Sequence, residues 1–181
     1  FLSKIQFKFF VTTLFMNNLP VLESRFSYPL STLQQIAQDI LAHAKKGGAT
    51  ACETNVSDGF GQNVTVRQSA VETIEYNRDK GLSVTVYIGQ KRGHASTSDF
   101  SPQAISDTVS AALSIARYTA NDDCAGLAEA ELLAQTYPHL NLYFPWELNV
   151  EGAIELAKEC EQAAYAVDKR ITNSEGATIS V

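Results

Sequence analysis

The chain has 181 residues, enough to form one domain with a packed core without the help of disulfides or a metal. It carries 14 Lys and Arg against 20 Asp and Glu, a net charge of −6, which argues against a nucleic-acid-binding face because such a face is basic. With 45% hydrophobic residues, the chain has too much apolar surface to remain disordered. Its three cysteines (Cys52, Cys124 and Cys160) contain no CxxC pair, which favours a reducing compartment over a disulfide framework or a zinc cluster.

The first 22 residues differ from the rest of the chain. The segment up to Met16 places two lysines ahead of an apolar run, as a signal peptide does, but no small-residue cleavage site follows. The run is also too short to span a bilayer. We expect residues 1–22 to be an extension outside the domain, with a translation start at Met16 and one domain over residues 23–181. A signal segment and an ordinary terminal strand or helix are the alternatives.

Three stretches have the apolar spacing of helices that bury one face. The first begins at Leu30 with a capping box made by Ser31 and Gln34, and residues 47–48, both glycine, end it. The second begins at the Ser101-Pro102 cap and ends near Thr119. The third covers residues 150–167. The positions expected to face inward are Leu33, Ile36, Ala37, Ile40, Leu41 and Ala44 in the first, Ile105, Val109, Ala112, Leu113 and Ala116 in the second, and Val150, Ala153, Ile154, Ala157, Cys160, Ala164 and Val167 in the third.

Between residues 51 and 98 the apolar period changes to two, which is typical of strands. Turn residues interrupt the pattern at residues 58–61, 69–70, 79–81 and 89–91, and these breaks are too short for parallel crossovers. We therefore predict an antiparallel meander of four to five strands with about three helices packed on it, an α+β fold. Residues 178–181 alternate again, either as a terminal strand that pairs back to the meander or as the start of a strand in a truncated chain.

The polar residues show no arrangement typical of a hydrolase. His43, His94 and His139 are far apart in sequence and none is followed by Glu, so no zinc-binding helix motif is present. Residues 94–99 bring His, Ser and Asp together, but neighbours on one strand stand side by side and cannot contact the imidazole from two sides. We interpret them as a polar strand end that leads into a helix cap. Residues 59–61, Gly-Phe-Gly, predict a hairpin turn rather than a phosphate-binding loop.

Residues 137–146 form an aromatic strip, with four aromatic residues in ten and a proline near each end. Proline keeps such a backbone extended, and the rings require cover from water. The strip either packs on the chain's own helices or docks a partner subunit.

Four strings of residues resemble a known family: STSDFSPQAI at residues 96–105, IARYT at 115–119, CAG at 124–126 and DKRITNSEG at 168–176. In this order they are similar to the amino-terminal domain of PmbA/TldE-like members of the TldD/PmbA peptidase family. The resemblance implies a cytoplasmic, two-component zinc metallopeptidase in which PmbA/TldE-like subunits associate with TldD-like subunits and with themselves. It also implies activity on unfolded or leader peptides, a part in the maturation of peptide antibiotics, and a link to modulation of DNA gyrase.

In that family the zinc motif, a His-Glu and a second His on one helix, belongs to the TldD-like partner and to a region beyond this span. No position here matches it, so we assign no catalytic, cofactor-binding or metal-binding residue to this chain. We expect a structural and recognition domain without direct contact to nucleic acid or membrane, in which an exposed strand edge of the meander accepts a peptide as a further strand. The alternative is a stand-alone module that binds a small ligand or a protein.

Overall fold

The computed structural model describes residues 26–132, 138 and 146–181. The chain divides into two compact units. Among the described residues, unit 1 contains 26–58, 80–132 and 138, and unit 2 contains 59–79 and 146–181. The domain predicted over residues 23–181 thus includes both units. The predicted extension with its start at Met16, and most of the aromatic strip, lie outside the described residues.

Four strands form one antiparallel sheet in the part of the chain that the structure describes. They are β1 (Ala51–Arg67), β2 (Ala70–Ile88), β3 (Lys91–Thr97) and β4 (Ala177–Ser180), in the order β3-β2-β1-β4. β3 pairs with β2 between Leu82 and Ile88, and β4 pairs with β1 between Asn63 and Val66. With the three α-helices described below, this sheet confirms the predicted α+β class. The last strand pairs back to the meander, one of the two alternatives for residues 178–181.

Two of the predicted turns are wrong. Residues 58–61 and 79–81 lie inside β1 and β2, which are therefore much longer than expected. A tight hairpin turn requires backbone with positive φ, and positive φ occurs at Gln68 and Ser69 (51° and 59°) and at Gly89 (60°), not within either of these segments. Glycine and aspartate disfavour strands only weakly, and pairing with a neighbouring strand overrides that preference.

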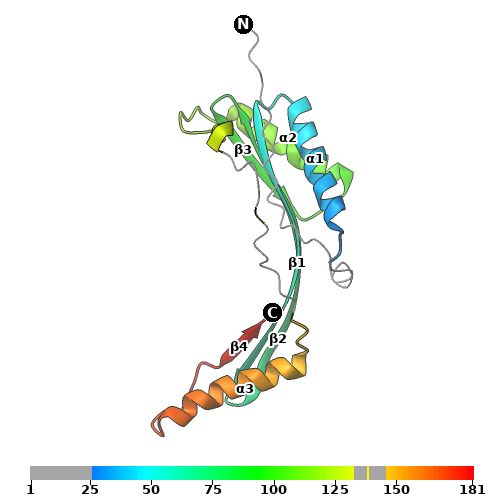
Figure 1. Cartoon of the computed structure of the whole chain (residues 1–181). Helices are drawn as coiled ribbons and strands as arrows, with labels where there is room; N and C mark the ends of the chain where they lie inside the picture. Colours follow the sequence, from blue (N-terminus) through cyan, green and yellow to red (C-terminus); the bar gives the residue numbers. More distant parts are fainter. Residues whose placement is uncertain (1–25, 133–137, 139–145) are drawn as a thin grey trace. The chain divides into compact units, whose positions relative to one another are not determined.

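Unit 1 places two helices on one face of the sheet (Figure 1). They are α1 (Leu30–Lys46) and α2 (Pro102–Tyr118), and a short 3-10 helix, η1 (Ala130–Leu132), follows. Aliphatic side chains from both helices and from β1 and β2 form the core, and the largest fully buried ones are Ile40, Val84, Val86 and Val109. α2 lies directly on β3 at Gly93, where an added Cβ would be 2.0 Å from the carbonyl oxygen of Ala112. The predicted inward faces of both helices are confirmed at most positions.

Both helices of unit 1 begin where predicted, but only one of the two predicted caps is confirmed. Ser101 caps α2 as expected, because its hydroxyl oxygen accepts from the backbone N–H of Ala104 at 3.3 Å. The capping box at Ser31 and Gln34 is wrong: α1 begins at Leu30 after Pro29, and no side chain caps it. The helix starts one residue before Ser31, so that hydroxyl is already inside the first turn.

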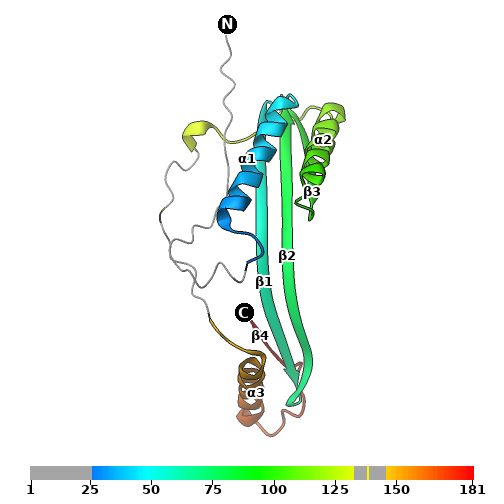
Figure 2. The ribbon, with the colours of Figure 1, turned by 90° about the vertical axis from the view of Figure 1, so that its right-hand side faces the viewer.

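Unit 2 contains the distal parts of β1 and β2, helix α3 (Val150–Val167) and β4, which lies beside β1 (Figure 2). α3 starts at the predicted residue, and its buried side chains are Ala153, Ala157 and Glu161. The inward placement of Cys160, Ala164 and Val167 is wrong, since all three are exposed. α3 packs through a narrow row of positions four residues apart, and Cys160 lies about 100° around the helix from Glu161.

Candidate functional site

The main site candidate is a stretch of β2 with one side lacking a strand partner. We call residues 70–77 the β2 edge segment. β3 covers β2 only from Leu82 to Ile88, so among the described strands none lies on the outer side of this segment. Each of its residues is exposed, whereas β1, its neighbour on the inner side, buries Val64 and Val66 completely. Strand edges of this kind present backbone N–H and C=O groups that can pair with another extended chain.

The side chains of the β2 edge segment combine apolar and acidic character. Val71, Ile74 and Tyr76 are 43%, 45% and 69% exposed. Glu72 and Glu75 are its charged residues, and Glu72 pairs with Arg67 at 3.7 Å. Because side chains of a strand alternate between its two faces, an added strand would meet apolar and acidic groups along its length. Such an arrangement suits a peptide that contributes backbone hydrogen bonds and apolar side chains.

The turn before this segment is unusual in its residues. Gln68 and Ser69 both have positive φ, a conformation that two-residue hairpins usually give to Gly, Asn or Asp. The carboxylate of Glu161 on α3 accepts the N–H of Gln68 at 2.8 Å and the N–H of Ser69 at 2.7 Å, one on each oxygen. Ser174 donates its hydroxyl to the same carboxylate. Glu161 is only 2% exposed, so a buried charge binds the tip of the hairpin.

The hydrogen bonds keep Glu161 ionised. The Ser174 hydroxyl, followed by the backbone N–H of Ser69, holds the pKa of Glu161 below its ordinary value. Burial raises this pKa, as desolvation does for any carboxylate, but the donors outweigh it. Arg67 adds a smaller lowering.

The loop after α3 completes this cluster. Ser174 accepts the N–H of Gly176 at 2.9 Å through its hydroxyl, and its carbonyl accepts Nε of Arg67 at 3.2 Å. Gly176 has φ +96°, and an added Cβ would be 2.6 Å from the carbonyl oxygen of Val66. We call Glu161, Ser174 and Gly176, with the backbone of Gln68 and Ser69, the hairpin clasp. The clasp includes part of residues 168–176, one of the strings that carry the family resemblance.

The structure gives residues 94–99 the role of a strand end and helix cap. His94 contacts Thr85, with Nδ1 3.0 Å from the hydroxyl oxygen. Asp99 accepts the N–H of Ser101 at 2.8 Å, and this bond lowers the pKa of Asp99. His94 and Asp99 therefore bond to different groups and form no triad.

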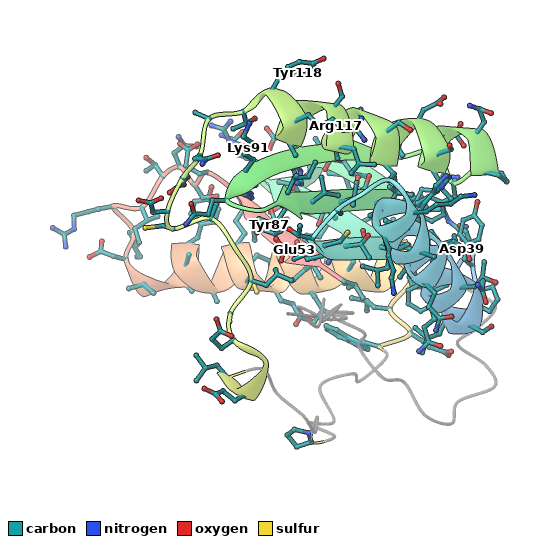
Figure 3. The ribbon with its side chains drawn as sticks, turned by 90° about the horizontal axis from the view of Figure 1, so that it is seen from above. Asp39, Glu53, Tyr87, Lys91, Arg117 and Tyr118 are labelled. Atoms are coloured by element: carbon teal, nitrogen blue, oxygen red, sulfur yellow. The ribbon has the colours of Figure 1, made fainter. Side chains whose placement is uncertain are left out.

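Two reactive groups of unit 1 are held in their protonated forms. Burial raises the pKa of the Cys52 thiol to about 12, so Cys52 is not a thiolate nucleophile at neutral pH. Tyr87 donates its hydroxyl to Glu53 at 3.1 Å (Figure 3), and burial followed by the charge of Glu53 raises the pKa of Tyr87. Cys124 and Cys160 are exposed and not in disulfides.

No cluster of three or more His, Cys, Asp or Glu that could hold a metal ion occurs in the described ranges, and His139 lies outside them. The lack of an assigned catalytic or metal residue stays a prediction. None of the helices in the described part of the chain combines the length and the apolar character that a bilayer-spanning helix requires.

Comparison with known families gives two adjacent matches. Residues 52–116 match the PmbA/TldA metallopeptidase domain 1, and residues 143–181 match the PmbA/TldA metallopeptidase central domain. Metalloprotease PmbA of Escherichia coli O157:H7 is 50% identical over 140 residues, which are 77% of this chain and 30% of that protein. A PmbA homologue of Haemophilus influenzae is 44% identical over 148 residues, 82% of this chain and 33% of that protein. The chain thus spans about a third of the length of these relatives.

Solved structures share the fold. A Bacteroides thetaiotaomicron protein named for modulation of DNA gyrase superposes with a TM-score of 0.68 at 23% identity, over 81% of this chain and 33% of that one. TldE of Thermococcus kodakarensis gives 0.55 at 14% identity, over 74% of this chain and 30% of that one. Together with the matching family models and the PmbA relatives, these findings show that the chain belongs to the TldD/PmbA metallopeptidase family and corresponds to the amino-terminal part of a PmbA/TldE-type member.

Proposed function

We propose that this chain serves assembly and peptide access in a PmbA/TldE-like subunit of a two-component zinc metallopeptidase of the cytoplasm. In this proposal a TldD-like partner holds the zinc and cuts unfolded or leader peptides. The 50% identity to metalloprotease PmbA supports this assignment. We assign two biological settings to this activity: modulation of DNA gyrase, for which the structurally similar protein of Bacteroides thetaiotaomicron is named, and the maturation of peptide antibiotics.

The observation that carries the role of this part is the exposed β2 edge segment. A peptide that adds to a strand edge is bound through its backbone, which every sequence shares, and its side chains add modest preferences. This mode of binding suits an enzyme whose substrates are unfolded rather than of one sequence. Val71, Ile74 and Tyr76 supply apolar contacts for such a strand, since their side chains are substantially exposed.

A pair of proline variants tests this role in the complete subunit with its TldD-like partner. Successive N–H groups of a strand point to opposite sides, so of Thr73→Pro and Ile74→Pro one removes an N–H of the β1–β2 ladder and the other an N–H of the outer side. We expect the variant that keeps its free energy of unfolding to lose most of its peptide turnover. Tyr118→Ala, at an 89% exposed position of α2, is the control. Turnover equal to the parent in both proline variants would contradict the proposal.

A further inference from the structure

The hairpin tip has a conformation that its own residues do not favour. A non-glycine residue with positive φ costs free energy, and here two such residues, Gln68 and Ser69, are consecutive. Such a turn persists when contacts with surrounding groups stabilise it enough to offset this cost. The surrounding group is the carboxylate of Glu161, which bonds the N–H of each of the two residues.

The hairpin tip has the geometry of an anion-binding site that is occupied by a carboxylate of the same chain. Successive backbone N–H groups in a turn form a concave, positively polarised surface that binds anions. The oxygens of Glu161 are 2.8 Å and 2.7 Å from these two nitrogens, and the side chain reaches them from a different element, α3. Ser174 fixes the orientation of the carboxylate through its hydroxyl.

The clasp acts on the residues that directly follow it. The β2 edge segment starts at residue 70, immediately after Ser69, and the described sheet holds it by β1 alone. Arg67 links the two, because it bonds the carbonyl of Ser174 and pairs with Glu72 of the segment. The orientation of the outer edge of β2 near the tip therefore depends on the clasp.

We infer that Glu161 is a positioning residue for peptide docking: its carboxylate holds the hairpin tip so that the β2 edge segment is presented as an extended strand that can pair. This inference rests on the proposed function. Glu161 does not touch the peptide in this account, and it acts through the backbone of Gln68 and Ser69.

The test compares Glu161→Ala with Glu159→Ala in the complete subunit and its TldD-like partner, because Glu159 is an exposed glutamate two residues earlier on the same helix. Two quantities are measured: the rate of hydrogen exchange of residues 68–77 and the KM for an unstructured peptide. Both are measured in sodium acetate and in sodium chloride of equal ionic strength. For Glu161→Ala we expect exchange and KM to rise on the order of tenfold with kcat little changed. Acetate, a free carboxylate that fits the vacated N–H groups, should restore much of the loss.

Parent-like exchange and KM in Glu161→Ala would overturn the inference. Loss of binding that acetate does not restore would also overturn it, since general destabilisation explains such a loss. Val64→Ala serves as a destabilising variant of the same unit that leaves the clasp intact, and acetate should not rescue it. If Glu161→Ala accelerates exchange at the tip and acetate reverses this while KM stays at the parent value, the clasp stands but its positioning role fails. If both proline variants also keep the parent turnover, the proposed function fails as well.

Discussion

Unit 1 and unit 2 bury different kinds of side chains. Unit 1 packs two helices on the sheet through aliphatic residues such as Ile40, Val84 and Val109, all at most 1% exposed. Unit 2 packs one helix through alanines, and its hairpin tip is bound by the buried carboxylate of Glu161. Apolar burial is insensitive to pH and tolerates little change in shape, whereas a carboxylate with several donors depends on its charge and on each donor. The stability of unit 1 therefore depends on apolar packing, whereas that of unit 2 also depends on a few polar groups.

The largest expected effect belongs to unit 1. In Gly93→Ala the new methyl group would lie 2.0 Å from the carbonyl oxygen of Ala112 and 2.6 Å from the nitrogen of Ala116, both backbone atoms of α2. α2 must move off β3, and we expect a loss of about 3 kcal/mol of unfolding free energy in chemical denaturation. Gly126→Ala is the matched control, because an added Cβ there meets nothing within 4 Å. Equal stability of the two variants would show that α2 does not pack as described.

In unit 2, substitution of Gly176 is expected to destabilise mainly because of its backbone conformation. Gly176→Ala places a side chain at φ +96° and 2.6 Å from the carbonyl oxygen of Val66. The backbone conformation alone costs about 1–3 kcal/mol. We expect faster hydrogen exchange at β4 and at the hairpin tip, with exchange in the core of unit 1 unchanged. Uniform acceleration in both units would argue that they do not unfold separately.

The charge of the clasp predicts a pH response at the hairpin tip. Because the folded pKa of Glu161 lies below the ordinary 4.5, its stabilising contribution is complete above pH 4.5 and is lost as the pH falls further through the folded pKa. Exchange at Gln68 and Ser69, corrected for the intrinsic pH dependence, should accelerate below pH 4.5. Glu161→Gln should remove this step and leave tip exchange fast at neutral pH. A step that persists in Glu161→Gln would assign it to another carboxylate.

The smallest expected effects come from one helix cap in each unit. Ser101 accepts the N–H of Ala104 at 3.3 Å, and Asn149 accepts the N–H of Gly152 at 2.9 Å. Replacement of either residue by Ala should cost about 1 kcal/mol of unfolding free energy, measured by denaturant titration. Each loss should appear in the exchange of its own unit. A cap variant that affects only the other unit would contradict the division into two.

The helices could be predicted almost to the residue because their signals are local. Ser101-Pro102 marks the start of α2, the apolar period marks its buried face, and the third helix has the predicted bounds. The length of β1 and β2 could not be predicted, because Asp58-Gly59 and Asp79-Lys80-Gly81 have the composition of turns. Pairing between distant parts of the chain determines the backbone conformation of these residues.

The clasp was also missed. A glutamate in a helix usually faces solvent, and the one available signal was that Glu161 continues the row of Ala153 and Ala157 at intervals of four. Its partners lie 93, 92 and 13 residues away in sequence, so only the fold brings them together. An exposed strand edge could be predicted from the meander, but its position on β2 depended on how far β3 extends, which no local pattern indicates.

The central claim is that an extended peptide pairs with residues 70–77 of β2. Hydrogen exchange of the complete subunit with its TldD-like partner, with and without a saturating unstructured peptide, measures this pairing directly. We expect the peptide to protect every second amide of the β2 edge segment, since alternate N–H groups face outward, and to leave α2 unchanged. Saturation of the complex by peptide with no added protection in residues 70–77 would contradict the account.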